Sequence, residues 1–266
     1  MTTTLDDARL AADLAVRAGD VLNGVRAEVG DADFDGKALK DRGDAVSHAF
    51  LMEEFAALRP DDAVLSEEGK DSAERLSADR VWIVDPLDGT REFSERGDDG
   101  VWRSDWAVHV ALWERGKGLT AGAVSLPARG LVYSTADALR LAPRAAEGPL
   151  RVAVSRTRPT QIVQELAGRQ DVEFVAMGSA GVKAMAVVSG EVDVYLHEGG
   201  QYEWDSAAPV VVALHAGLVA TRLDGSDFVY NRSDPWLPDV YISRPEFHPQ
   251  LRVLVDELLQ TRETPS

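Results

Sequence analysis

The hexapeptide DPLDGT at residues 85–90 combines groups that suit metal and phosphate chemistry. The apolar run 81–84 before it is typical of a buried strand, which would carry Asp85 from the core into a turn. The proline of the hexapeptide fixes its own φ, and the glycine allows a positive φ. Such a turn can direct the carboxylates of Asp85 and Asp88 and the carbonyl of Leu87 toward one point.

Carboxylates that converge without Lys or Arg partners repel one another, and they separate or take up protons unless cations lie between them. Because the chain has no cysteine and only five histidines, its available ligands are mainly oxygen atoms, which favours Mg²⁺, Mn²⁺ or Ca²⁺. Gly89 and Thr90 add backbone N–H groups and a hydroxyl, as a phosphate seat requires. Metal ions beside such a seat can activate water and stabilise a leaving oxygen, so the hexapeptide predicts a metal-dependent phosphatase.

Two further acidic groups stand at the ends of predicted elements. Glu67 and Glu68 follow a short β-like run at residues 63–66, and Asp205 precedes a predicted helix at residues 206–216. Carboxylates at such places are often solvated turn residues or helix N-caps. Asp205 would also face the positive end of the helix dipole, so it can act as cap and metal ligand together.

The predicted elements change in kind near residue 145. Before it, two helices precede a mostly antiparallel set of strands, at 63–66, 81–84, 106–113, 118–126 and 131–134, and the second of these helices is predicted over 45–58. After it, strands at 150–154, 172–177 and 192–197 alternate with helices, as βαβ units do. We therefore predict an α/β protein with an α+β lobe over residues 1–145 and an α/β lobe over residues 146–266.

The charge balance limits the partners. Forty-five acidic against 28 basic side chains give a formal net charge of −17, a field that repels nucleic acid polymers and anionic membranes. The first 20 residues have neither the basic start of a signal peptide nor an apolar run long enough to span a membrane. We expect a cytoplasmic protein that acts on a small phosphorylated substrate.

Taken together, Glu67-Glu68, residues 85–93 and the WDS sequence at residues 204–206 resemble, in order and spacing, the inositol monophosphatase superfamily of metal-dependent, lithium-sensitive phosphatases. The resemblance runs from the first helix through Gly217. It implies a layered α-β-α-β-α fold and two or three Mg²⁺ ions, and it raises a homodimer as one assembly. The metal ligands it implies are Glu68, Asp85, Leu87 through its carbonyl, Asp88 and Asp205. By the same resemblance Gly89 and Thr90 hold the phosphate, and Thr90 also orients the attacking water.

The chain looks most like the CysQ branch of this family, the 3′(2′),5′-bisphosphate nucleotidases, which remove the 3′-phosphate from 3′-phosphoadenosine 5′-phosphate (PAP). Ser155 and Arg156 match a pair that lies near the nucleotide in that branch. The stretch from Gly178 and Ser179 to Lys183 begins a predicted helix and would suit a second anion. A packed helix start with a solvated lysine explains the same stretch equally well.

One position departs from the family pattern. The family's V-T-x-x-D run, whose Asp helps prepare the water, is matched here by residues 46–50, which end in Phe50. Phenylalanine cannot accept a proton. Asp44 is the nearest acidic replacement, unless it only caps the helix predicted from residue 45, and Glu68 is the alternative.

Three functions follow from these observations. The first is hydrolysis of PAP or a similar bisphosphorylated nucleotide. The second is the same chemistry on a sugar phosphate such as inositol monophosphate or fructose 1,6-bisphosphate. The third is a metal-binding protein that has lost catalysis, which Phe50 suggests.

Overall fold

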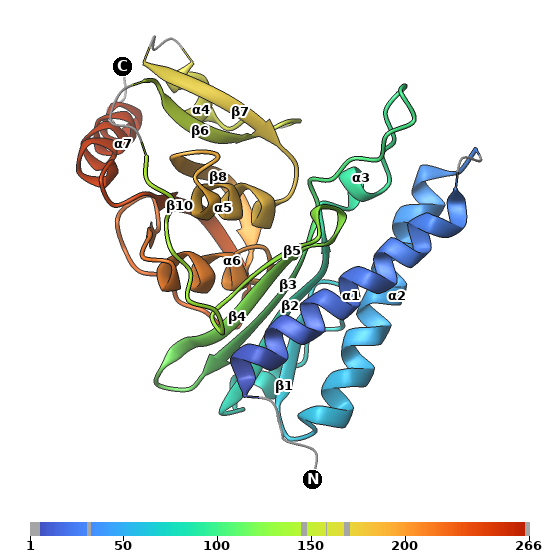
Figure 1. Cartoon of the computed structure of the whole chain (residues 1–266). Coiled ribbons are helices and arrows are strands. Elements are labelled where there is room, and N and C mark those ends of the chain that lie inside the picture. Colours follow the sequence, from blue (N-terminus) through green and yellow to red (C-terminus); the bar gives the residue numbers. More distant parts are fainter. Residues whose placement is uncertain (1–5, 31–32, 145–147, 158, 168–170, 264–266) are drawn as a thin grey trace.

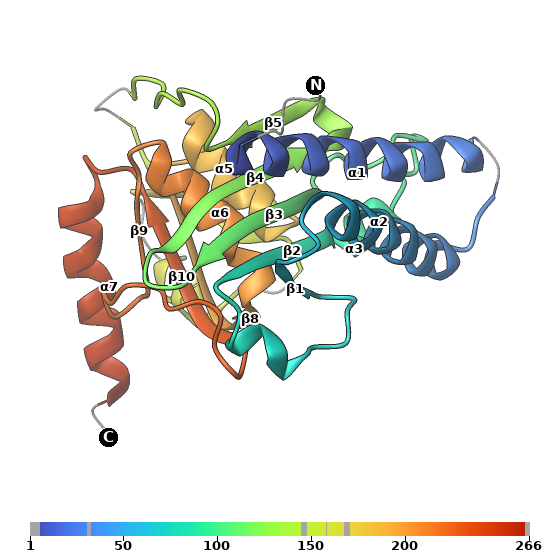
Figure 2. The same cartoon turned by 90° about the horizontal axis from the view of Figure 1, so that it is seen from below.

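The computed structural model describes residues 6–30, 33–144, 148–157, 159–167 and 171–263. These form five layers, helix-sheet-helix-sheet-helix (Figures 1 and 2). The layered α/β architecture confirms the predicted fold class. None of the helices in the described ranges combines the length and apolar character needed to cross a membrane.

The first sheet has its strands side by side in chain order, and only its first pair is parallel. Its strands are β1 (Ala63–Ser66), β2 (Arg80–Asp88), β3 (Ala107–Glu114), β4 (Gly118–Leu126) and β5 (Leu131–Ser134). Two helices, α1 (Asp7–Val29) and α2 (Gly36–Leu58), cover one face of this sheet (Figure 2). Short 3₁₀ turns at Ala73–Leu76 and Pro127–Arg129 join the strands.

Helix α1 has the predicted spacing of apolar residues. Leu10, Leu14, Ala18 and Leu22 are buried at intervals of four residues and pack with the first sheet, where burial of each leucine contributes about 1.5–3 kcal/mol. The helix begins after Asp6, whose side chain accepts a hydrogen bond from Arg9 N at 2.8 Å.

Helix α2 begins nine residues earlier than predicted, after Asp35, whose carboxylate accepts from Lys37 N at 2.8 Å. Asp44 therefore lies inside the helix, and its interpretation as an N-cap is wrong. Gly43 does not end the helix. A side chain there would collide with the neighbouring segment, because a Cβ at this position would lie 2.6 Å from Phe93 and 3.0 Å from Leu87. The glycine allows α2 to approach the segment that follows β2.

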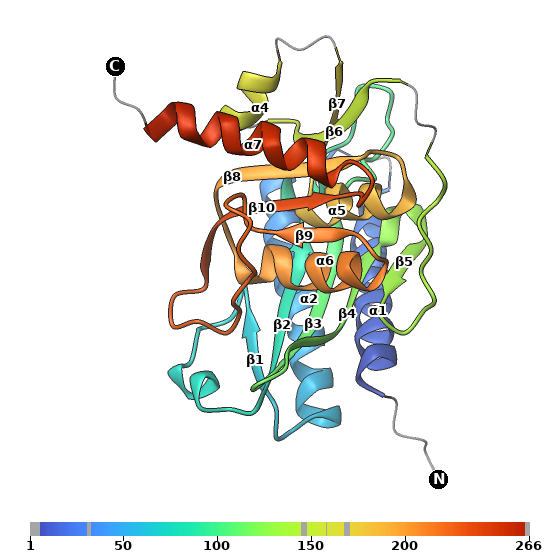
Figure 3. The ribbon, with the colours of Figure 1, turned by 90° about the vertical axis from the view of Figure 1, so that its left-hand side faces the viewer.

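The second sheet contains the order β7-β6-β8-β10-β9, with parallel pairs around β6 and antiparallel pairs around β10. Its strands are β6 (Leu150–Ser155), β7 (Val172–Met177), β8 (Val194–Tyr202), β9 (Val219–Thr221) and β10 (Trp236–Ser243). Helices α5 (Ala180–Ser189) and α6 (Glu203–His215) lie between the two sheets, whereas α4 (Gln161–Leu166) and α7 (His248–Glu263) cover the outer face (Figure 3).

One buried cluster joins the two halves of the chain around α5 and α6. It includes Ile83 and Val124 from the first sheet and Ala153 and Tyr195 from the second. The predicted division between residues 145 and 146 falls at residues outside the described ranges and stays a prediction.

Candidate active site

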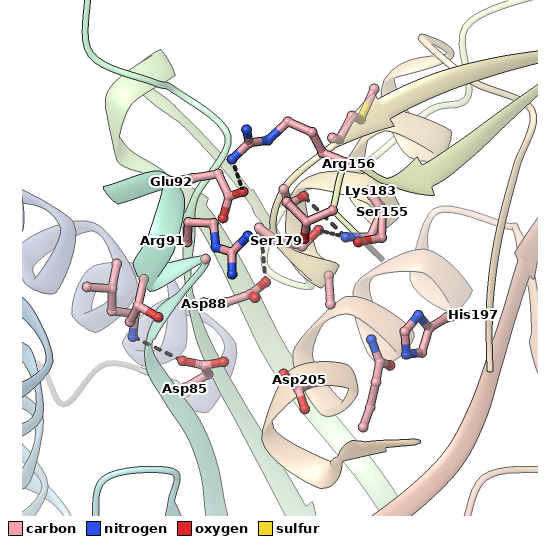
Figure 4. A pocket seen from close by; sticks show the side chains of 18 of the residues that line it. Asp85, Asp88, Arg91, Glu92, Ser155, Arg156, Ser179, Lys183, His197 and Asp205 are labelled. Atoms are coloured by element: carbon pink, nitrogen blue, oxygen red, sulfur yellow. Dashed lines mark hydrogen bonds and ion pairs between the residues drawn. The ribbon is translucent and has the colours of Figure 1, made fainter. Parts of the chain in front are cut away.

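A cavity of about 350 Å³ opens where the ends of β2, β6 and β8 meet the first turns of α5 and α6 (Figure 4). Most of the residues singled out in the sequence line it. They are Asp85, Leu87, Asp88, Gly89, Thr90, Ser155, Arg156, Gly178, Ser179, Lys183 and Asp205. The fold thus brings together residues that are up to 120 positions apart in the sequence.

Strand β2 delivers the hexapeptide to this cavity. Its pairing register with β3 shifts between Asp85 and Asp88, so that both carboxylates reach the same side. Gly89 then adopts a φ of 86°, and a Cβ on it would lie 3.2 Å from Asp105 O. Glycine is therefore required both for the conformation and for the close approach. The short helix α3 (Thr90–Phe93) follows directly.

The acidic end of the cavity is formed by Asp85, Asp88 and Asp205, each of which offers an oxygen within 4.8 Å of the others. Asp85 Oδ1 accepts from Leu87 N at 3.0 Å, but its buried Oδ2 has no hydrogen-bond partner. Helix α6 begins three residues earlier than predicted, so Asp205 lies in its first turn, where it accepts from the N-cap Tyr202 N at 2.6 Å while facing the cluster. Within the described ranges, no Lys or Arg forms an ion pair with Asp85.

The electrostatics of this end favour a cation. Burial, followed by repulsion from Glu67 and Asp88, raises the pKa of Asp85 well above its usual value. Burial, followed by repulsion from Asp88, raises the pKa of Asp205 to about 6. A divalent ion would relieve this repulsion and give the unpartnered Oδ2 of Asp85 a partner. These oxygen donors therefore fit a hard metal ion.

Asp88 is held differently from its neighbours. Its Oδ2 accepts from Gly181 N at 2.7 Å and from the hydroxyl of Ser179, and it lies 3.2 Å from His109 Nε2. Burial opposes ionisation, yet His109 and these donors keep the pKa of Asp88 below its usual value. His109 is fully buried, and its Nδ1 lies 3.1 Å from Trp204 O. Its strand position did not reveal this contact, which depends on the distant α5 and α6.

Glu67, rather than Glu68, is the glutamate that lines the cavity. Burial and the nearby Asp205 raise the pKa of Glu67 to about 7, whereas the neighbouring Asp85 carboxyl acts in the opposite direction. Both glutamates keep exposed surface, but Glu68 is not among the lining residues. The expectation that Glu68 is a metal ligand is corrected accordingly, because neighbouring residues in the turn after β1 face different surroundings.

Asp44 does not line the cavity either. It is buried in α2, where burial and repulsion from Glu68 raise its pKa to about 7. Instead, α2 contacts the hexapeptide through Ser47, whose hydroxyl donates to Pro86 O at 2.7 Å. Phe50 is partly buried against the core that α1 and α2 form with the first sheet, and the guanidinium of Arg17 lies 5.0 Å from the centre of its ring.

The hydrogen-bond donors in the first turn of α5 already have partners within the protein. Gly178 N donates to Asp105 Oδ2 at 2.7 Å, and the hydroxyl of Ser179 donates to Asp88. Lys183 Nζ donates to the carbonyls of Ser179 and Gly178 at 2.5 Å and 3.2 Å. These groups line the cavity, and their bonds within the chain hold the acidic end together. That they bind a second phosphate stays a prediction.

The sequence model of the inositol monophosphatase family matches residues 7–258. The chain belongs to this family. It is 50% identical to the 3′-phosphoadenosine 5′-phosphate phosphatase of Mycobacterium leprae, over 96% of each chain. It is 31% identical to the 3′(2′),5′-bisphosphate nucleotidase CysQ of Salmonella typhimurium, over 73% of this chain and 80% of that one.

Solved structures of the family have the same fold. An IMPase of Thermotoga maritima superposes with a TM-score of 0.74 at 21% identity, and the match covers 97% of this chain and 99% of that one. At this identity the likeness concerns the fold alone. Family membership and layered fold both confirm what the motifs in the sequence predicted.

Proposed function

We propose that this chain is a Mg²⁺-dependent phosphatase that removes the 3′-phosphate from PAP. The observation that carries the proposal is the buried, unpartnered Oδ2 of Asp85 within the cluster of Asp85, Asp88 and Asp205, directly beside the half-buried turn of Gly89 and Thr90. The relative at 50% identity, named for this activity, supports the choice of substrate.

Each residue at the acidic end has a role in this proposal. The carboxylates of Glu67, Asp85, Asp88 and Asp205 and the carbonyl of Leu87 hold two or three Mg²⁺ ions. Bound there, the ions supply activation of water and stabilisation of the leaving 3′-oxygen. Gly89 and Thr90 bind the transferred phosphate through their N–H groups, and the Thr90 hydroxyl orients the attacking water.

We also propose a pathway and a compartment for the reaction. PAP is a by-product of sulfate transfer, so we place the chain in sulfur metabolism and in the cytoplasm. A homodimer, which the family resemblance raises as one assembly, is part of the same proposal.

A substrate panel tests the proposal. Released phosphate is measured with Mg²⁺ on PAP, inositol 1-phosphate and fructose 1,6-bisphosphate, and the Asp85→Asn variant gives the background. We expect the highest kcat/KM for PAP. A preference for inositol 1-phosphate or fructose 1,6-bisphosphate would reject PAP as the substrate. Metal binding without phosphate release from any of the three would indicate a protein that has lost catalysis.

A further inference from the structure

The cavity is lined by basic side chains as well as by its acidic cluster. Four basic side chains line it: Arg91, Arg156, Lys183 and His197. A substrate with two phosphates presents one to the metal ligands and needs a cation for the other. The hydrogen bonds of these four side chains decide which of them is available.

The ammonium group of Lys183 already has hydrogen-bond partners within the protein. Its side chain is buried, and its ammonium donates to the backbone carbonyls of Gly178 and Ser179. It is also close enough to Asp88 and Asp205 to interact with their charges. Its positive charge therefore offsets the acidic cluster rather than attracting a ligand. His197 lies 3.3 Å from Gly200 O through its Nε2, and burial lowers its pKa, so it is neutral near pH 7.

Arg156 is held by two glutamates. Its Nη2 donates to Glu92 at 2.9 Å (Figure 4). The same Nη2 donates to Glu95 at 2.5 Å, and Nη1 donates to Glu95 at 3.2 Å. One positive charge against two negative charges leaves this corner with a formal charge of −1. Glu92 is fixed in place because Gly178 leaves it room: a Cβ on Gly178 would lie 2.4 Å from the Glu92 carboxyl carbon. A phosphate approaching Arg156 therefore meets net negative charge.

Arg91 differs from all three. It is exposed and follows Thr90 directly, and its guanidinium forms no hydrogen bond or ion pair with any residue in the described ranges. In Figure 4 its guanidinium group points into the cavity. A guanidinium presents a fork of N–H donors that matches two phosphate oxygens at once.

We propose that Arg91 binds the phosphate that is not transferred, and that it thereby makes the site prefer a bisphosphorylated nucleotide. This inference rests on the proposed function and deepens it, because it names the residue that selects the substrate class. Arg156, which the family resemblance suggested for that role, is instead a neutralised structural contact between the two halves of the cavity.

A pair of substrates isolates this contact. PAP and adenosine 3′-phosphate carry the same transferred phosphate, but only PAP has the second one. We expect Arg91→Met to lower kcat/KM for PAP by about 10- to 100-fold, the value of a charged hydrogen bond, and to leave adenosine 3′-phosphate within about twofold. Arg91→Lys should retain part of the preference, because it keeps the charge but loses the fork.

Adenosine 5′-phosphate, the product that retains only the second phosphate, gives a separate readout. Its inhibition constant should rise in Arg91→Met by the same factor as the loss on PAP, while inhibition by inorganic phosphate stays unchanged. Lys117→Met, which removes an exposed positive charge from the distant β3–β4 hairpin, is the matched control and should alter neither substrate. Because Arg91 is exposed and unpaired, the melting temperature should not change.

Equal losses on PAP and adenosine 3′-phosphate would place Arg91 at the transferred phosphate and overturn the inference. Unchanged activity on both substrates would also overturn it. Failure of the proposed function would appear differently, as a wild-type protein that does not hydrolyse PAP at all or that prefers a sugar phosphate.

Discussion

Two buried carboxylates in this molecule have opposite surroundings: one is paired with arginines, and the other is not. Asp193, fully buried directly before β8, receives hydrogen bonds from the guanidinium groups of Arg144 and Arg151 at 2.8 Å each. These bonds outweigh its burial and lower its pKa to about 2. Asp85, only 1% exposed, has no arginine, and its pKa is raised.

The difference separates a structural carboxylate from one reserved for a ligand. At Asp193, which has a structural role only, two arginines stabilise the buried negative charge. At Asp85, further carboxylates surround the buried charge instead, and their repulsion lowers the stability of the fold. A bound cation would restore that stability. The same logic separates Arg156, which two glutamates neutralise, from the unpaired Arg91.

Removal of the Asp85 carboxylate should have the largest effect. We expect Asp85→Asn to lower kcat on PAP at least about a thousandfold, since metal ions contribute several kcal/mol and each 1.36 kcal/mol is tenfold in rate. Phosphate release with Mg²⁺ measures this. Asp61→Asn, at an exposed turn, is the matched control and should retain wild-type turnover. More than a tenth of wild-type turnover in Asp85→Asn would refute the role of Asp85.

Removal of the Asp193 carboxylate should affect folding instead. We expect Asp193→Ala to lower the free energy of unfolding by about 3–5 kcal/mol, because it leaves two arginines beside a buried gap. Denaturant unfolding measures the loss. The protein that remains folded should keep its kcat, since Asp193 does not line the cavity. A variant as stable as wild type would show that the arginines are not what stabilises this site.

Asp44→Asn should have the smallest effect. A general base contributes about 10²–10⁴-fold to the rate, but Asp44 does not line the cavity, so we expect kcat to stay close to wild type. Stability should rise slightly near pH 7, because the substitution removes a carboxyl group whose ionisation is opposed by burial. A hundredfold fall in kcat at unchanged melting temperature would identify Asp44 as a base after all.

Local features of the sequence predicted the centre of the site. The apolar run before Asp85 and the glycine at position 89 determine β2 and its turn without help from distant residues. Asp205 was identifiable because a carboxylate that begins a helix serves as its cap. These residues depend on neighbours in the sequence, so their positions follow from short patterns.

What the sequence did not reveal depends on packing. The helix was predicted only from residue 45, whereas Gly43 lies inside α2 and is needed for its contact with Phe93, which only the folded chain shows. Glu67 and Glu68 have the same chemistry, and only the turn after β1 decides which one enters the cavity. The first turn of α5 resembled an anion site, yet Asp105 and Asp88 accept hydrogen bonds from its N–H groups, from 73 and 93 residues earlier in the sequence. Strands β9 and β10 and helix α7 were not predicted.

The pH dependence of stability connects the acidic cluster to its proposed metal. Burial raises the pKa of Asp205 to about 6 and of Glu67 to about 7. Such groups stabilise the fold fully below their unfolded pKa, near about 4, and the contribution is lost as the pH rises through the folded pKa. In EDTA, the free energy of unfolding should therefore fall as the pH rises from about 4 to about 7.

The central claim is that the carboxylates around Asp85 form a divalent metal site. Its most direct test is the free energy of unfolding near neutral pH in EDTA and in Mg²⁺, for wild type and Asp85→Asn in parallel. We expect Mg²⁺ at about a hundred times its dissociation constant to stabilise wild type by about 2.7 kcal/mol, to remove most of the fall with pH, and to leave Asp85→Asn almost unaffected. The same Mg²⁺ stabilisation in both proteins, or none in wild type, would contradict the account.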